Sequence, residues 1–174
     1  MSPETVFRIH LVLGYAAWLL CFAVYIWPRL KAMETVEAQR AIATLHSFRI
    51  FGLVFIVPGA VGSNLPISFA SFAAYGDFAT GVLAMLALAT IRIRPLFWLF
   101  VVAFNVTGAA DILVDYYHAT QINLPAMAGE LGSTYAIPIL YVPILMITHV
   151  LSLYWLARSA LEARAPAAMG SAAL

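Results

Sequence analysis

The sequence has few charged residues and a single cysteine. Cys21 alone can form neither an intramolecular disulfide nor a thiolate metal cluster, so we expect it to be a small apolar side chain inside a helix. Acidic and basic residues make up 10% of the 174 residues, and the formal net charge is +1. There is thus no basic face for nucleic acid, and no glycine-rich phosphate loop indicates a nucleotide site.

Hydrophobic residues dominate the composition. They make up 64% of the chain, which is above the range of soluble domains and predicts an all-α integral membrane protein. Polar breaks separate five apolar segments, each long enough to cross a hydrocarbon layer of about 30 Å. We expect transmembrane helices at 5–27, 44–63, 72–91, 95–117 and 135–157. They form one domain, 1–164, and a flexible cytoplasmic tail follows at 165–174.

The positive charges predict the orientation of these helices. Lysine and arginine near helix ends stay on the cytoplasmic side. With the N-terminus outside, every cation except Arg8 falls inside: Arg29, Lys31, Arg40, Arg49, Arg92, Arg94, Arg158 and Arg164. The pattern predicts a multi-pass protein of the bacterial cytoplasmic (inner) membrane, with the N-terminus outside and the C-terminus in the cytoplasm.

Polar side chains interrupt the fourth apolar segment, in "FNVTGAADILVDYYHA" at 104–119. Asp111, Asp115 and His118 are spaced i, i+4 and i+7, so they share one helix face. Gly108 continues that face inward and leaves room for a neighbouring helix or a bound molecule. Asn105 lies one turn further along. This face predicts a binding site, because acids in a membrane normally face a bundle interior or a cavity.

Two residues from other segments are expected at the depth of Asp111. The third segment starts outside, which places Asp77 roughly 8 Å below the outer end. His10 lies about five residues into the first segment, at 1.5 Å per residue. We therefore expect His10, Asp77 and Asp111 to converge in one outer-leaflet pocket, with Asp115 and His118 at its mouth.

These residues suggest roles in acid–base chemistry. Asp111 would be the proton donor, Asp77 its base or charge stabiliser, and His10 a proton relay. The expected substrate-binding residues are Asp115, His118, Gly108 and Asn105. Structural roles also stay open: interfacial solvation of Asp115 and His118, or a hydrogen bond of Asp77 or Asp111 between helices. Asp111, Asp115, His118 and His10 could also ligate a divalent ion, but no metal-ligand spacing is recognised and we predict no metal.

The inner half holds two more histidines and a basic residue. We expect Arg49 to anchor the second segment at the cytoplasmic interface. His149 lies deep in the last segment, where a hydrogen bond across the bundle is its ordinary role. His46 and His149 are cofactor ligands only if haem is bound. Prolines at 58, 138 and 143 predict kinks in the middle-to-outer part of the bundle.

Three sequence blocks carry a resemblance to known proteins. "HSFRIFGLVFIVPG", "AAYGDFATG" and "FNVTGAADIL" resemble blocks of uncharacterised small bacterial five-helix membrane proteins, which implies the fold and supplies no activity. "LHSF" is also similar, much more weakly, to the "AHSG" run of styrene oxide isomerase, a membrane enzyme that rearranges epoxides and binds haem through a histidine. That similarity implies haem ligation by His46. Gly52 departs from it, standing where that family has a functional asparagine, and five helices are expected against its four.

Together these patterns predict an integral membrane enzyme of the isomerase or lyase class. It would isomerise or rearrange a small lipophilic substrate, such as an epoxide or isoprenoid-like molecule, by proton transfer in an outer-leaflet pocket. No cofactor is expected, with haem b as the alternative. A haem-binding protein and a proton-coupled carrier remain alternative functions. The expected partners are the lipophilic substrate and membrane lipid, with no nucleic acid and a possible homo-oligomer.

Overall fold

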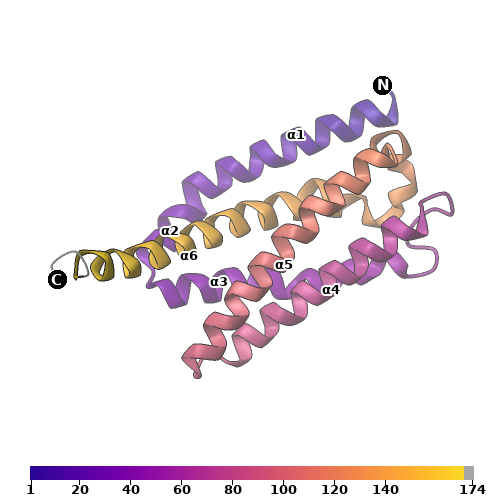
Figure 1. Cartoon of the computed structure of the whole chain (residues 1–174). Coiled ribbons are helices and arrows are strands. Elements are labelled where there is room, and N and C mark those ends of the chain that lie inside the picture. Colours follow the sequence, from indigo (N-terminus) through magenta and orange to yellow (C-terminus); the bar gives the residue numbers. More distant parts are fainter. Residues whose placement is uncertain (171–174) are drawn as a thin grey trace.

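The protein is a bundle of helices in the computed structural model, which describes the backbone of residues 1–170 and the side chains of residues 1–162. No strand occurs within those residues (Figure 1). The elements in chain order are α1 Pro3–Cys21, η1 Phe22–Ile26, α2 Trp27–Ala32, α3 Thr35–Ser47, η2 Phe48–Ile56, α4 Ile67–Ala89, α5 Arg94–Gln121, η3 Leu124–Tyr135, η4 Ile137–Tyr141 and α6 Val142–Gly170. The prediction of an all-α chain is confirmed.

Four helices in the described part of the chain are long and apolar enough to cross a membrane. They are Pro3–Ala32, Ile67–Ala89, Arg94–Gln121 and Ile137–Glu162. Each contains one of the predicted spans or most of it, and together they indicate a multi-pass membrane protein. The predicted span at 44–63 differs, because α3 changes there into the 3₁₀ helix η2, which ends at Ile56.

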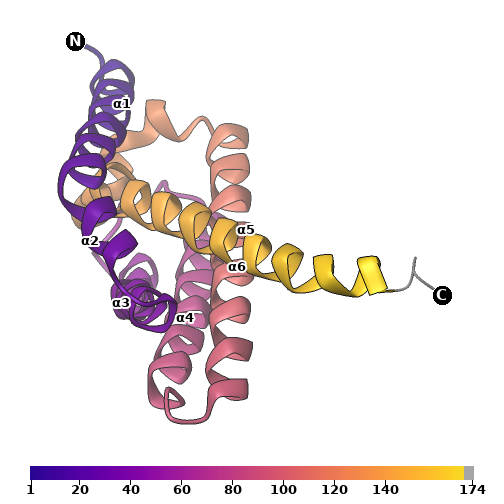
Figure 2. The same ribbon diagram turned by 90° about the vertical axis from the view of Figure 1, so that its left-hand side faces the viewer.

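The bundle has two ends, which we name by the chain termini nearest to them. Ser2, the loop 57–66 and the segment 122–136 lie at the N-terminal end (Figure 1). The turns at 33–34 and 90–93 lie at the C-terminal end, from which the last part of α6 projects (Figure 2). α6 is helical to Gly170, so the predicted tail 165–174 begins as helix, and residues 171–174 lie outside the described part.

Proline affects the helices in two ways. Pro58 ends η2 instead of kinking it, since Val57 before it is extended, as a residue preceding proline prefers. Pro138 lies in the π-helical turn η4, where regular hydrogen bonding is interrupted. There the indole nitrogen of Trp18 donates to the carbonyl oxygen of Leu140 at 2.6 Å. A side chain of α1 thus hydrogen-bonds to the backbone of this irregular turn.

Two apolar clusters form the core, one toward each end of the bundle. Phe55, Phe69 and Leu131 belong to the cluster at the N-terminal end. Phe97 and Phe104 belong to the cluster at the C-terminal end. Along α4 and α5 the residues between these clusters are polar and buried, which places the candidate site in the middle of the bundle.

Candidate functional site

Arg49 is the centre of the site. It lies on η2, its side chain is 1% exposed, and it forms an ion pair with a carboxylate on each of two other helices. Its Nε donates to Asp77 Oδ1 at 2.6 Å, and its Nη2 donates to Asp111 Oδ2 at 2.5 Å. Its Nη1 donates to the carbonyl oxygen of Gly108 at 3.2 Å. Arg49 thus joins η2, α4 and α5, and the expectation that it anchors the chain at the membrane interface is wrong.

Glycines allow this close approach of the helices. A methyl group on Gly52 would collide with the Asp77 carboxylate, and one on Gly76 would collide with the carboxylate of Asp111. Gly108 has Arg49 Nη1 and His149 Nε2 as near neighbours. Small residues at these contacts bring the backbones close enough for the short polar side chains to meet.

Histidine and amide side chains extend the polar core from Arg49 toward the C-terminal end. Arg49 Nη1 lies 3.2 Å from His149 Nε2, and His149 Nδ1 lies 2.9 Å from Asn105 Oδ1. Because arginine has only donors, His149 Nε2 must accept and Nδ1 must carry the hydrogen. Thr148 Oγ1 lies 3.0 Å from His46 Nε2. Further along, Ser152 donates to the Gln39 side-chain oxygen.

Four buried side-chain atoms in the described part of the chain have no hydrogen-bond partner: Gln39 Nε2, His46 Nδ1, Asp111 Oδ1 and Asp115 Oδ1. All four belong to this polar core or to its continuation along α5. An unpaired polar atom in a core is costly, commonly about 1–3 kcal/mol, and a water molecule or a ligand at these positions would satisfy it.

A cavity of about 300 Å³ lies between the Arg49 cluster and the N-terminal end of the bundle. Its volume is in the range of small-molecule sites. Apolar side chains from α1, η2, α4, α5 and η3 form most of its wall, among them Phe7, Leu11, Phe55, Phe69 and Leu131. Arg49, Asp77 and Asp115 are polar residues on the wall. Arg8 from α1 is a further charged residue on the wall, so the cavity is a mostly apolar chamber lined by four charged side chains.

The structure brings some of the predicted site residues together. Asp77 and Asp111 meet at Arg49, and both lie near the middle of the bundle. Asp77 is ten residues from the start of α4, about 15 Å at 1.5 Å per residue. This is deeper than the predicted 8 Å, because α4 begins at Ile67 instead of residue 72. Asp115 lines the cavity, and its role in binding a substrate stays a prediction.

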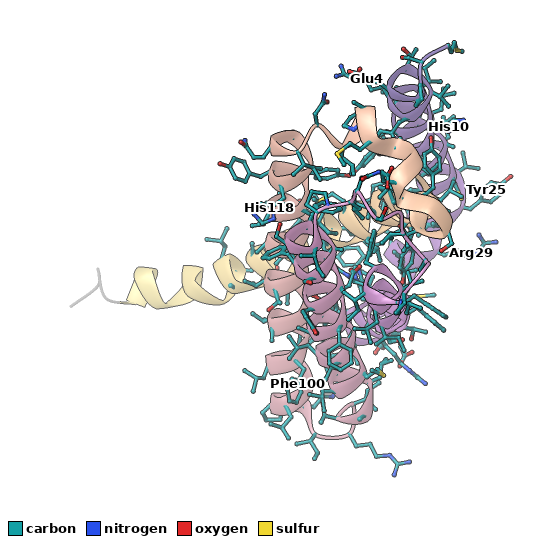
Figure 3. The ribbon with its side chains drawn as sticks, turned by 90° about the vertical axis from the view of Figure 1, so that its right-hand side faces the viewer. Glu4, His10, Tyr25, Arg29, Phe100 and His118 are labelled. Carbon is teal, nitrogen blue, oxygen red and sulfur yellow. The ribbon has the colours of Figure 1, made fainter. Side chains whose placement is uncertain are left out.

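Other predicted site residues lie elsewhere. His10 is exposed on α1 and lies 3.1 Å from the Tyr135 hydroxyl, so it does not join the carboxylates. His118 packs against the ring of Phe72 and is not on the cavity wall. In Figure 3, His10 and His118 lie on different sides of the bundle. Asn105 and Gly108 contact the Arg49 and His149 side of the cluster instead of the cavity.

A haem does not fit the two buried histidines as they are placed. The rings of His46 and His149 lie against each other, with centroids 3.9 Å apart, which leaves no room for a porphyrin between them. Both nitrogens of His149 have partners. No group of three potential metal ligands occurs among the described residues, so the donor set proposed from Asp111, Asp115, His118 and His10 is not assembled.

Sequence reasoning missed Arg49 as a site residue. The available signal was charge balance, because two carboxylates in neighbouring spans require a cation or protons at the same depth. Arg49 is directly followed by an apolar run, in "HSFRIFGLVFIV". Gly52 lies three residues after Arg49, which is one turn of a 3₁₀ helix, and was a second indication that Arg49 belongs to the site.

The fold and the ion-paired core define a small multi-pass membrane protein with a buried polar centre and an apolar cavity. Residues 6–157 match the family described as a domain of unknown function (DUF8737), and the chain belongs to this family. No curated protein and no solved structure matches the chain. These findings give no support to a relation with styrene oxide isomerase.

Proposed function

We propose that the protein is an integral membrane enzyme that isomerises or rearranges a small lipophilic substrate in the cavity above the Arg49 cluster. The observation that carries this proposal is the position of Asp115. Its carboxyl group lines a mostly apolar cavity, and its Oδ1 is buried without a partner. A lipophilic molecule in that cavity would place its reacting atoms beside a group that can give or take a proton.

The structure favours Asp115 over Asp111 as the group that transfers protons. Asp77 and Asp111 are each held by Arg49, which stabilises their charged forms. Asp115 lies one helical turn from Asp111 and has no ion pair within the described residues. An isomerisation leaves the atomic composition of the substrate unchanged. A carboxyl group that donates one proton to the substrate and later accepts another from it therefore ends the reaction in its starting protonation state.

In this mechanism Arg49, Asp77 and Asp111 act as a fixed array of charges. An array that is organised before the reaction stabilises charge developing in the substrate without reorganising. General acid–base catalysis contributes about 10²–10⁴-fold. Such a gain suits intrinsically reactive molecules, such as strained epoxides and polyenes, and is too small for inert ones.

The proposal includes five membrane crossings, with the N-terminus outside. α3 and η2 together run from Thr35 to Ile56. At 1.5 Å and 2.0 Å per residue they span roughly 37 Å, enough for the hydrocarbon layer. Lys31, Arg92 and Arg94 lie next to the turns at the C-terminal end, and their positive charge supports a cytoplasmic position for that end. The cavity then opens in the outer leaflet of a bacterial inner membrane.

The test is a search for an isomeric product. Purified protein in lipid nanodiscs would be incubated with limonene oxide and with styrene oxide, and products would be identified by gas chromatography and mass spectrometry. We expect a product of unchanged mass, and a loss of about 10²–10⁴-fold in its rate of formation for Asp115→Asn. Glu37→Gln is the matched control, because it removes an exposed carboxylate outside the cavity.

Two results would overturn the enzyme proposal. One is an unchanged rate for Asp115→Asn. The other is uptake of these molecules into vesicles without any isomer formed, if that uptake stops when the proton gradient is dissipated. The second result would identify a proton-coupled carrier instead.

A further inference from the structure

A second region with an unpaired polar group lies at the other end of the bundle. Two adjoining cavities, of about 230 Å³ and about 500 Å³, meet where α6 leaves the bundle (Figure 2). Thr35, Trp155 and Ser159 line both of them. We call this pair of cavities the C-terminal cleft. None of its residues lines the cavity at the N-terminal end, and Gln39 is the far end of the polar core that extends from Arg49.

One part of the C-terminal cleft is basic. Lys31 and Arg158 line the smaller cavity together with Glu162. Arg158 forms an exposed ion pair with Glu162, and Lys31 has no ion pair within the described residues. The three side chains together carry one net positive charge, which suits an anionic group at the membrane surface.

The other part of the cleft is apolar and contains a buried amide. Trp98, Val102 and Leu156 line the larger cavity beside Gln39. Gln39 is 0% exposed; its side-chain oxygen accepts from Ser152 at 2.6 Å, and its Nε2 has no partner. Gln39 is a lining residue of this cavity, so an acceptor oxygen that reaches Nε2 through this part of the wall would complete the amide.

The apolar part of the cleft extends further into the bundle than the basic part. Gln39 is one turn further into the bundle than Thr35 on α3, about 6 Å along the helix. Lys31 lies before Thr35, at the end of the bundle. Tryptophan on both sides of the larger cavity is typical of the membrane interface, where lipid esters lie.

We propose that the C-terminal cleft binds one anionic glycerophospholipid from the cytoplasmic leaflet. Lys31 and Arg158 bind its phosphate, Gln39 Nε2 donates to an ester carbonyl oxygen, and an acyl chain lies along Trp98, Val102 and Leu156. This site is independent of the proposed enzyme activity, because it lies in the opposite half of the bundle. The lipid is recognised by charge at one end of the cleft and by a hydrogen bond at the other.

The experiment measures lipid binding by native mass spectrometry. The full chain in detergent would be titrated with palmitoyl-oleoyl phosphatidylglycerol and, in parallel, with the phosphatidylcholine of the same acyl chains. We expect one tightly retained phosphatidylglycerol. The double variant Lys31→Gln, Arg158→Gln should weaken its binding about twentyfold, since each cation near an anionic lipid contributes about fivefold.

The matched control is the double variant Arg92→Gln, Arg94→Gln. It removes the same charge from the same end of the bundle, and neither residue lines the cleft. We expect this control to bind phosphatidylglycerol as the unchanged protein does. If it loses as much affinity as the Lys31 and Arg158 variant, the effect is a general surface charge and the proposal is overturned.

The amide contact has its own test. Gln39→Met keeps the length of the side chain and removes the donor, so it should weaken binding of both lipids. Should that variant fail to fold, Ser159→Phe serves instead, because the position is exposed and a phenyl ring there fills the region shared by both cavities. Equal binding of the two lipids, or unchanged binding in the folded variant, would overturn the proposal.

Discussion

Arg49 uses different nitrogen atoms for its two carboxylates, Nε for Asp77 and Nη2 for Asp111. Its third nitrogen atom, Nη1, donates to the carbonyl oxygen of Gly108. A lysine ammonium in this position would be a single point charge and could not match this planar fan of donors. The residue therefore fixes the relative positions of three helices as well as balancing their charge.

The first prediction concerns the loss of this guanidinium. Arg49→Met should lower the free energy of unfolding by about 3–5 kcal/mol, because it leaves two carboxylates buried without their partner. Thermal unfolding in detergent, followed by tryptophan fluorescence, measures the loss. Arg40→Gln is the control, since Arg40 makes only an exposed ion pair, with Glu37, and such pairs contribute about 0–1 kcal/mol. Equal stability of the two variants would contradict the structural role of Arg49.

Of the individual residues in the site, the sequence predicted some and missed others. Helix spacing and depth brought Asp77 and Asp111 into one region, because both lie in apolar segments that run in opposite directions. The same reasoning failed for His10, since depth does not determine the face of α1 on which a residue lies. It failed for Arg49 because a cation near a helix end satisfies the positive-inside pattern without being buried. Whether a residue joins the site therefore depends on where its partners lie, which the composition of its own segment does not specify.

Among the elements, η2 explains how Arg49 reaches the core. Its buried residues are Arg49, Gly52 and Phe55, three positions apart. A 3₁₀ helix has three residues per turn, so these positions share one face, whereas in an α-helix they would drift around the axis. Arg49 and Gly52 then both face the α4 carboxylate, and Phe55 continues into the apolar cluster. Runs of nine residues in this conformation are uncommon, which indicates that tertiary contacts hold it.

The second prediction tests the contact between η2 and α4. Gly52→Ala should lower the free energy of unfolding by about 1–3 kcal/mol, because the added methyl group collides with the Asp77 carboxylate. Gly129→Ala is the matched control, since a methyl group at that exposed position meets nothing within 4 Å. It should change stability by no more than about 0.5 kcal/mol. Thermal unfolding of both variants under the same conditions provides the comparison, and a neutral Gly52→Ala would show that η2 and α4 are not tightly packed.

The sequence predicted which segments are helical better than it predicted where each helix begins and where it changes from α to 3₁₀. Apolar length located four of the spans, because that property depends on composition alone. Helix starts were less accurate: α3 begins at Thr35, nine residues before the predicted span at 44, since its exposed face is polar. The change to a 3₁₀ helix at Phe48 follows from the contacts of Arg49 and Gly52 with other helices, which no local pattern specifies.

For the whole molecule, α1 differs from the other long helices. In the span Pro3–Ala32, which contains α1, only 6% of the most apolar stretch of 18 residues is buried. The corresponding share is 39% in each of the other three candidate spans. Aromatic side chains attach it to the bundle: Tyr15 bonds to Tyr116, and Trp18 donates to the backbone of η4. We expect the exposed apolar side chains of α1, including Leu13 and Leu20, to face lipid. This assignment requires α1 to cross the bilayer beside the bundle.

The last prediction concerns the side of the membrane on which each end lies. In a Cys21→Ala background, single cysteines would be placed by Ser2→Cys, Asn64→Cys and Arg92→Cys. A membrane-impermeant maleimide added to intact cells should label the first two, because both lie at the N-terminal end, and should label the third only after permeabilisation. Since α1 and the α3–η2 segment both lie between Ser2 and Asn64, labelling of these two from the same side excludes a crossing by only one of the segments. Because α1 is long and apolar enough to cross, that result supports a crossing by α3–η2 as well. Labelling of Asn64→Cys and Arg92→Cys from the same side would mean that α4 does not cross, and would contradict the five-crossing arrangement.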